Sequence, residues 1–143
     1  MFEVVKNPIH DSPTQLPMRA TQSSAGHDFY LKETIVLQPQ ETKLTFTDVK
    51  CQLLDDTFLS VHIRSSVGVK KHIMLANGTG IIDSDYYNNS SNDGNIGIAL
   101  HNYGQKAITL EAGERVAQGI IQAYRAFDKI DRVRGGGFGS TES

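Results

Sequence analysis

The sequence has few of the residues that mark a disulfide-bonded, metal-binding or membrane-spanning protein. Its 143 residues include one cysteine, Cys51, and no tryptophan. A single cysteine cannot form an internal disulfide, and no metal-type Cys/His spacing surrounds it, so we expect a buried strand thiol and a reducing compartment. No apolar run approaches the roughly 18 residues of a membrane helix. MFEVVKNPIH at the N-terminus lacks a basic start followed by an apolar segment, so we expect no signal peptide and a cytoplasmic location.

The chain also lacks a strong net charge. Its formal charge is -2 at pH 7, with 38% hydrophobic and 21% charged residues. This balance argues against nonspecific binding to nucleic acid or acidic membranes and is typical of a soluble globular domain. The net charge does not argue against a small anionic ligand, because local arginines and backbone amides decide the binding of such a ligand more than the net charge does.

Short β-rich runs recur along the chain, separated by turn-forming Gly, Asn, Asp and Pro. We expect strands at residues 2–5, 33–38, 43–53, 57–64, 80–83, 95–102, 107–113 and 115–124. Many short strands at this spacing indicate an all-β sandwich or barrel. Residues 65–77 alone have helical character, and we expect at most one short helix there, which Ser65 or Ser66 is able to cap.

Two segments are polar and poor in core-forming residues. YNNSSND (87–93) is turn-prone, and the chain after about Phe127 turns charged and then glycine-rich, ending RGGGFGSTES. We therefore expect a β domain over residues 1–126 and a flexible C-terminal arm over residues 127–143. Taken alone, the arm is either a disordered tail or a segment that orders over a ligand, with Phe138 as a stacking lid.

The stretch NGTGIIDSDYY (77–87) places Asp83 and Asp85 directly after two isoleucines. Alternate side chains of a strand share a face, so both aspartates are expected to point the same way. Taken alone, this is the pattern of an exposed polar face at a strand end, followed by a turn.

Five stretches give the pattern a more specific interpretation. They are SAGHDFYL (24–31), IRSSVG (63–68), NGTGIIDSDYY (77–87), GERVAQGII (113–121) and RGGGFGST (134–141). In this order and spacing, from Leu16 to Thr141, they resemble the motifs of the homotrimeric deoxyuridine triphosphatase (dUTPase) family, whose members hydrolyse dUTP to dUMP and pyrophosphate. The resemblance implies a jelly-roll-like (β-clip) barrel subunit, and an enzyme that keeps uracil out of DNA and supplies dUMP for dTTP synthesis.

The resemblance also implies roles for residues at the reacting centre. Asp83 would orient and deprotonate the water that attacks the α-phosphorus, and Gln118 would contact that water and the phosphates. Asp85 is expected to form structural hydrogen bonds at a hairpin. Uracil and deoxyribose would be bound by Asn77, Gly80, Ile82, Tyr86 and Phe138. Tyr86 would pack on the sugar and leave no space for a 2′-hydroxyl.

The triphosphate would be bound by a second group of residues: Arg64, Ser65, Ser66, Gln118, Arg134, Ser140 and Thr141. Backbone amides at the start of the expected helix add an anion site. The spacing of the last motif leaves open whether Arg134 or Arg132 contacts the γ-phosphate. The resemblance implies Mg²⁺, which takes phosphate oxygens and waters, with Asp28 as a contact through water.

The sequence departs from the family pattern in two informative places. Arg64-Ser65-Ser66 replaces the usual Arg-Ser-Gly and resembles the related dCTP deaminases, but Ala99 stands where that family has its catalytic glutamate, so we reject deamination. Seven residues, Tyr87 to Asp93, stand where the third motif usually has one, and we expect them to extend a hairpin near the site.

The resemblance finally implies an assembly and a rival function. Each site would take the second and fourth motifs from one subunit, the third from a neighbour and the arm from the third subunit. The alternative function is a phage-type dUTPase that also binds a host repressor in a nucleotide-dependent way, using the 87–93 loop and the arm.

Overall fold

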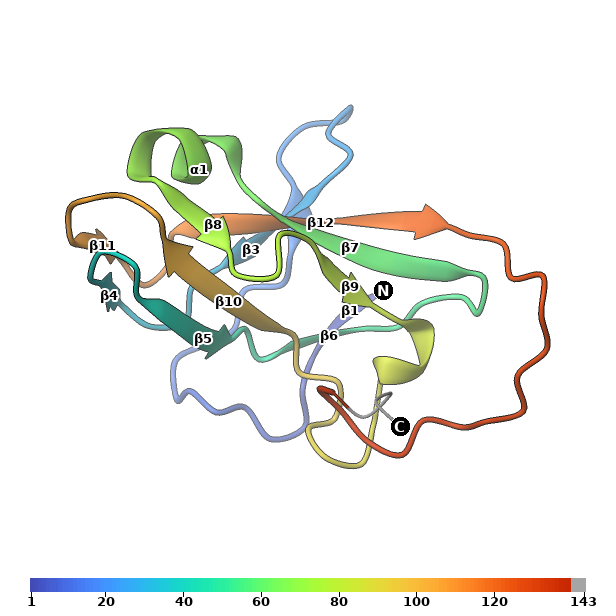
Figure 1. Cartoon of the computed structure of the whole chain (residues 1–143). Coiled ribbons are helices and arrows are strands. Elements are labelled where there is room, and N and C mark those ends of the chain that lie inside the picture. Colours follow the sequence, from blue (N-terminus) through green and yellow to red (C-terminus); the bar gives the residue numbers. More distant parts are fainter. Residues whose placement is uncertain (140–143) are drawn as a thin grey trace.

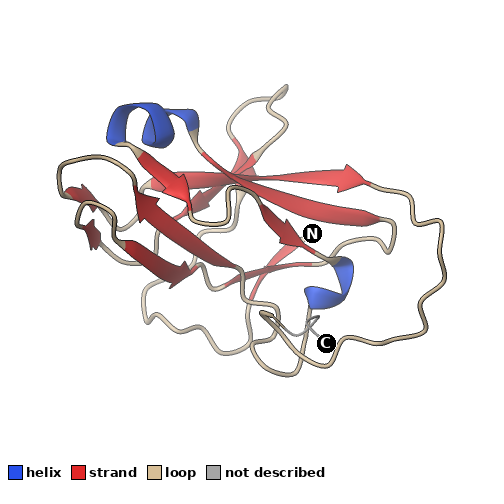
Figure 2. Cartoon of the chain, viewed as in Figure 1, coloured by secondary structure: helices blue, strands red, loops and turns tan. Residues whose placement is uncertain are grey.

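The computed structural model describes residues 1–139, which are almost entirely β-structure (Figures 1 and 2). The strands are β1 (Phe2–Val4), β2 (Met18–Arg19), β3 (His27–Tyr30), β4 (Ile35–Leu37), β5 (Thr42–Phe46), β6 (Val49–Cys51), β7 (Thr57–Ile63), β8 (Ile73–Leu75), β9 (Gly80–Ile82), β10 (Gly97–Asn102), β11 (Ile108–Leu110) and β12 (Arg115–Ala123). In the same residues there is one α-helix, α1 (Ser65–Lys71), and one 3-10 helix, η1 (Ser84–Tyr86). No helix of this part of the chain is long and apolar enough to cross a membrane.

The strands form two larger and two smaller antiparallel sheets. The five-stranded sheet has the order β2-β3-β12-β7-β9, and the three-stranded sheet has the order β5-β10-β8. The pairs β1-β6 and β11-β4 complete the sandwich (Figure 2). The long central strand β12 pairs with β7 from Ala117↔Ile63 to Ala123↔Thr57, which fixes the register of the sheet that carries Asp28, Gly80, Ile82 and Gln118.

The core lies between the two larger sheets. Phe29 and Leu59 come from the five-stranded sheet, Ile73 and Leu100 from the three-stranded sheet, and all four are fully buried in one cluster. Cys51 belongs to the same cluster at 2% exposure, which confirms the expected buried strand thiol. The all-β prediction is confirmed because alternating strands can bury one face each against the facing sheet.

The predicted strand over residues 43–53 is wrong in one respect, since it is two strands that belong to different sheets. β5 ends at Phe46 and β6 begins at Val49. Asp48, between them, has a left-handed backbone with φ 59°. Strand geometry cannot continue through such a residue, so the chain leaves one sheet and enters another. The short strands β2, β3 and β8 were not predicted, because they have two to four residues and little alternation.

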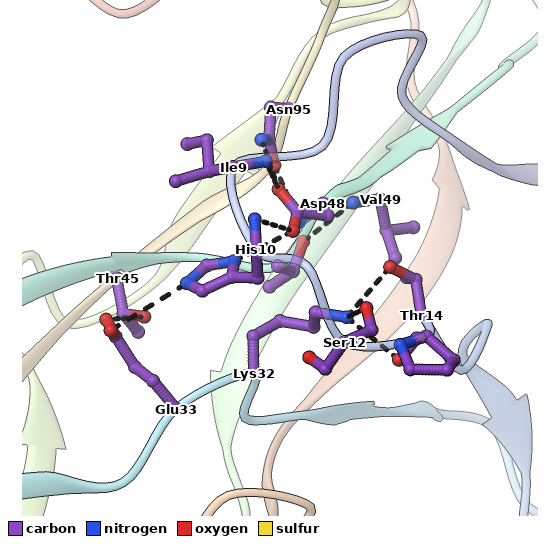
Figure 3. Close-up of polar contacts among 12 residues, drawn as sticks. Ile9, His10, Ser12, Thr14, Lys32, Glu33, Thr45, Asp48, Val49 and Asn95 are labelled. Carbon is purple, nitrogen blue, oxygen red and sulfur yellow. Dashed lines mark hydrogen bonds and ion pairs between the residues drawn. The ribbon is translucent and has the colours of Figure 1, made fainter.

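Asp48 also fastens the N-terminal segment to this junction (Figure 3). Its fully buried carboxylate accepts hydrogen bonds from the Ile9 amide (2.9 Å) and the His10 amide (3.1 Å). The same carboxylate also forms hydrogen bonds with His10 Nδ1 (2.7 Å) and Asn95 Nδ2 (3.1 Å). Burial raises the pKa of Asp48, but these hydrogen bonds outweigh burial and leave the pKa below its ordinary value.

Helix α1 begins without the serine cap that the sequence suggested. The N-cap is Arg64, whose backbone is extended (φ -71°, ψ 142°) and whose side chain makes no capping hydrogen bond. Ser65 and Ser66 therefore lie in the first turn, with both residues exposed. The helix ends at Lys71, and the next residue, His72, takes a left-handed conformation. The expectation of one short helix is confirmed.

The segment from Ile73 to Tyr86 crosses between the two larger sheets. β8 pairs with β10 in the three-stranded sheet, whereas β9 pairs with β7 in the five-stranded sheet. The expected hairpin is therefore absent from this segment. Asp83 follows the end of β9 and Asp85 lies in η1, so strand alternation does not explain their common direction.

After β12, residues 124–139 contain neither helix nor strand. In Figure 1 this red segment leaves the end of β12, runs around the molecule and returns to the loop that follows η1. The arm thus brings residues near 134–139 against a part of the chain about 50 residues earlier in the sequence.

Candidate active site

A narrow cavity of about 170 Å³ opens between β9, η1, β10 and the arm. It is lined by seven of the predicted residues: Asn77, Gly80, Ile82, Asp83, Tyr86, Arg134 and Phe138. Asn77 comes before β9 and Asp83 comes directly after it, so the crossing of the chain from β8 to β9 brings both residues to the cavity. The structure therefore brings together the residues that the sequence predicted for uracil and deoxyribose.

Apolar walls of the same cavity were not predicted from the sequence. Val61 of β7, Leu75 of β8 and Ile98 of β10 line it, together with Ala99. Apolar residues such as these form no sequence pattern that marks a binding site. They come together only because the two sheets face each other. Ala99 contributes no carboxylate to the cavity.

Tyr86 forms a rigid wall of the cavity. The residue is 6% exposed, and its hydroxyl donates to the Asn95 carbonyl oxygen (2.8 Å) and accepts from Asn92 Nδ2 (2.9 Å). Burial raises the pKa of Tyr86, and the Asn92 hydrogen bond and the Arg134 charge offset this only in part. The phenol therefore stays protonated at neutral pH and acts as a fixed surface rather than as an acid.

Arg134 of the arm binds both aspartates of the third motif. Its NH2 lies 2.9 Å from Asp83 Oδ2, and its Nε lies 2.8 Å from Asp85 Oδ1. The guanidinium also lies over the Tyr86 ring, 5.7 Å from the centroid, and the Arg134 side chain is 8% exposed. The sequence left open whether Arg132 or Arg134 contacts the γ-phosphate. Of these two arm residues, Arg134 lies at the cavity, whereas Arg132 is exposed.

A second, basic hollow of about 410 Å³ lies beside the start of α1. Four cationic side chains line it, those of Arg64, Lys70, Lys71 and Arg115. The predicted Ser66 lines it too, as does Glu114, whose Oε1 lies 2.7 Å from Lys71 Nζ. Only Arg64 and Ser66 were predicted, although Arg115 lies in the fourth motif. This concentration of cations next to exposed serine hydroxyls suits the oxygens of a triphosphate.

Asp28 holds two of these arginines in place. Its Oδ1 lies 3.1 Å from Arg64 Nε, and its Oδ2 lies 3.1 Å from Arg115 NH1. The residue is 5% exposed, so both carboxylate oxygens face guanidinium groups rather than solvent. In this structure Asp28 orients Arg64 and Arg115.

Gln118 lies in β12 between the two strands that carry these groups. It pairs with Asp28 of β3 on one side and with His62 of β7 on the other. Gly26 packs directly on the Gln118 side chain, and a Cβ at that position would collide with Oε1. The glycine of the first motif therefore makes space for the glutamine of the fourth.

The cavity lies beside η1 and the basic hollow beside α1. In Figure 1 these two helices lie at opposite ends of the molecule. Leu59 of β7 pairs with Ile82, so Asp83 lies level with Phe58, at the opposite end of β7 from Arg64. Six residues of strand separate these positions by about 20 Å. Asp83 and Arg64 of the same chain therefore lie in separate pockets.

The structure describes only some of the predicted residues of the arm. Phe138 lines the cavity but is 74% exposed. Ser140 and Thr141, predicted to bind phosphate, lie outside the described residues 1–139.

Comparisons with known proteins agree on one family. The sequence profile of the dUTPase family matches residues 12–142. A deoxyuridine 5'-triphosphate nucleotidohydrolase of Lactococcus lactis is 37% identical over 98% of this chain and 95% of its own length. One of Neisseria gonorrhoeae is 37% identical over 90% of this chain and 88% of its own length. The chain belongs to the dUTPase family.

Solved structures agree with this assignment and with the jelly-roll fold. The crystal structure of the dUTPase from Streptococcus mutans is 34% identical, with a TM-score of 0.81 over 90% of this chain and 98% of that chain. A dUTPase from phage phi11 of S. aureus is 22% identical with a TM-score of 0.71 over 92% of this chain and 97% of that chain. At 22% identity, the phage dUTPase shows a similarity of fold alone, so it does not favour the phage-type regulatory function.

Proposed function

We propose that this protein hydrolyses dUTP to dUMP and pyrophosphate. The observation that carries the proposal is the position of Asp83, at the edge of a narrow cavity walled by Tyr86, in a chain of the dUTPase family. A carboxylate beside a nucleoside-sized cavity is placed to serve water at the α-phosphorus of the bound nucleotide.

The cavity accounts for selectivity toward deoxyuridine. Asn77 supplies amide donor and acceptor groups for the uracil edge, and Val61 and Ile98 close the apolar sides. Gly80 is tightly packed, since a Cβ there would lie 3.2 Å from Val61 Cβ. The Tyr86 ring, fixed by two hydrogen bonds, leaves no space for a 2′-hydroxyl, so dUTP is accepted and UTP is rejected.

The reaction is an in-line hydrolysis. The oxygen of a water molecule forms a bond with the α-phosphorus, and the bond to the α–β bridging oxygen breaks, which releases pyrophosphate. Asp83 accepts the proton of the attacking water. Arg134 has to move from the aspartates to the triphosphate for this step, and the greater negative charge of the triphosphate favours that exchange.

The phosphates are bound by the basic hollow of another subunit. Arg64, Ser65, Ser66 and Gln118 must lie within a few ångströms of the α-phosphorus to act there. In one chain the position of Arg64 is about 20 Å from Asp83, by the strand spacing. This separation supports a homotrimer with sites shared between subunits, as the family resemblance implies.

Magnesium is proposed to enter with the triphosphate rather than to occupy a protein site. Residues 1–139 contain no group of three His, Cys, Asp or Glu side chains able to hold a metal ion. Asp28 fits poorly as a metal contact, because both its oxygens are in ion pairs and the residue is 5% exposed. Bound to the phosphates, Mg²⁺ would neutralise charge on the pyrophosphate that leaves.

The experiment is pyrophosphate release from dUTP, dCTP, dTTP and UTP with Mg²⁺, comparing wild type with Asp83→Asn. We expect release from dUTP and a loss of at least about a thousandfold in kcat for the variant, because asparagine cannot accept the proton. Asp85→Asn is the matched control and is expected to retain most of the activity. Equal rates for wild type and Asp83→Asn would refute the proposed role of Asp83, and wild type that binds dUTP without hydrolysing it would favour the regulatory alternative.

Such an enzyme acts on a soluble nucleotide. We propose a cytoplasmic location, and a role in keeping uracil out of DNA and in supplying dUMP for dTTP synthesis.

A further inference from the structure

Residues 87–93 form a compact loop between η1 and β10, not the extended hairpin that the sequence suggested. Asn89 organises it from the inside. Its Nδ2 donates to the Tyr86 carbonyl oxygen (2.8 Å) and to Asn92 Oδ1 (2.7 Å). Its Oδ1 accepts from the amides of Ser91 (3.0 Å) and Asn92 (3.1 Å). Four hydrogen bonds from one side chain fix the shape of the turn.

The Ser91 hydroxyl at the tip of this turn faces the C-terminal arm. Ser91 Oγ donates to Asn89 Oδ1 (2.9 Å), which uses its single proton. Its lone pairs are then available to accept, and the amide of Gly137 donates to them at 2.7 Å. The loop therefore presents an oriented acceptor to a backbone N–H of the arm.

Gly137 fits this position because it has no side chain. A Cβ there would lie 2.5 Å from Ser91 Oγ, 3.0 Å from Asn89 Oδ1 and 3.1 Å from Asn92 Oδ1. Gly135, two residues earlier, would place its Cβ within 4 Å of nothing. Neither glycine has a left-handed backbone, so the requirement at Gly137 is close approach and not φ.

The other side of Gly137 leads to the reacting centre. Its carbonyl oxygen accepts from Arg134 NH1 at 3.3 Å, and Arg134 NH2 lies 2.9 Å from Asp83. Asn92, at the end of the same loop, donates to the Tyr86 hydroxyl. One loop thus contacts the arm on one side and the sugar-binding ring on the other.

We propose that the turn Asn89–Asn92 is the docking site of the arm, with Ser91 and Gly137 as the positioning pair. Docking places Phe138 at the cavity and brings Arg134 beside the aspartates, from which it moves to the triphosphate when nucleotide binds. The inference rests on the proposed dUTP hydrolysis for its effect on rate.

The first test uses four single variants in two matched pairs. Ser91→Ala removes the acceptor, and we expect kcat/KM for dUTP to fall about fivefold, the value of one hydrogen bond. Gly137→Ala forces the arm off the loop, and we expect a fall of at least about tenfold. Gly135→Ala, whose new Cβ would meet nothing within 4 Å, and Ser23→Ala, at an exposed serine between β2 and β3, are expected to stay within about twofold of wild type.

A double variant separates docking from a general loss of structure. Ser91→Ala removes the atom nearest to the Cβ of Ala at position 137. The combined variant should therefore retain more activity than the product of the two single effects. A double variant whose loss equals that product would overturn the proposal, because the two residues would then act independently.

The second test needs no catalysis. Hydrogen–deuterium exchange of a peptide covering residues 134–139 should be slow in the full-length protein without nucleotide. Exchange should increase in Ser91→Ala and Gly137→Ala and stay unchanged in the two controls, while peptides from β7 are unaffected in all. Equal exchange in Gly137→Ala and Gly135→Ala would overturn arm docking. Wild type that shows this protection but releases no pyrophosphate from dUTP would instead refute the proposed function alone.

Discussion

At the scale of single residues, the site depends on neighbours that position the reactive groups. Asp28 binds Arg64 and Arg115 with both oxygens, and Gly26 makes space for Gln118. The sequence predicted Asp28 near a metal and gave Gly26 no role. Their function in this structure comes from contacts across strands that are far apart in the chain.

Gly26→Ala is expected to reduce activity through Gln118. The new methyl group would overlap Gln118 Oε1 and push the side chain out of its present position. We expect kcat to fall about tenfold, with a change in the free energy of unfolding of about 1 kcal/mol, because a flexible side-chain end can move aside. Steady-state kinetics and thermal unfolding measure the two quantities.

Gln118→Ala provides the control background for this prediction. If Gly26 acts through Gln118, Gly26→Ala should have no further effect on kcat when the glutamine is already absent. A full additional tenfold loss in that background would show that Gly26 acts by another route.

At the scale of elements, irregular segments rather than strands carry the chemistry. Asp83 and Asp85 share Arg134 although one follows β9 and the other lies in η1. The N-terminal segment, which has no regular structure after β1 until β2, is held in place by the buried Asp48 between β5 and β6. A single carboxylate thus substitutes for a strand pairing.

Asp48→Asn is expected to destabilise the fold in a pH-dependent way. The folded pKa of Asp48 lies below its ordinary value of 3.8, so its contribution is fully present above about pH 4 and is lost as the pH falls through the folded pKa. At pH 7 we expect the variant to lose about 3 kcal/mol, because a buried, charge-assisted network is broken. The difference from wild type should shrink below about pH 3.8.

Urea unfolding of both proteins between pH 2 and pH 8 measures this effect. Glu33→Gln is the control, since the exposed Glu33 lies 3.8 Å from His10 Nε2, and we expect a change below about 0.5 kcal/mol. A constant difference between wild type and Asp48→Asn across the whole range would contradict ionisation of Asp48 as the cause.

At the scale of the whole molecule, the two groups of predicted site residues do not meet within one chain. The cavity with Asp83 and the hollow with Arg64 lie at opposite ends of β7. The arm of this chain folds back on its own cavity, whereas the family resemblance predicts an arm supplied by another subunit. The subunit that supplies the arm thus stays a prediction.

Mixed oligomers test that prediction. One variant carries Asp83→Asn with an intact arm, and the other ends at Val133 with Asp83 intact. If arms act between subunits, refolding the two inactive variants together should restore part of the activity, because some sites then combine an intact Asp83 with an intact arm. If each arm serves its own chain, every site lacks one component and the mixture should remain inactive.

The sequence by itself determined the β class, the buried cysteine and the order of the five motifs. Alternating strands and fixed motif spacing are local properties, and they survive in the fold.

The tertiary structure decided the features that the sequence pattern does not contain. The left-handed Asp48 splits a predicted strand, the crossing from β8 to β9 replaces a hairpin, and the facing sheets bring Val61, Leu75 and Ile98 to one cavity. It also placed Ser91 against Gly137. These contacts join residues distant in the chain, and no local periodicity encodes them, so only the packed molecule shows which polar groups meet.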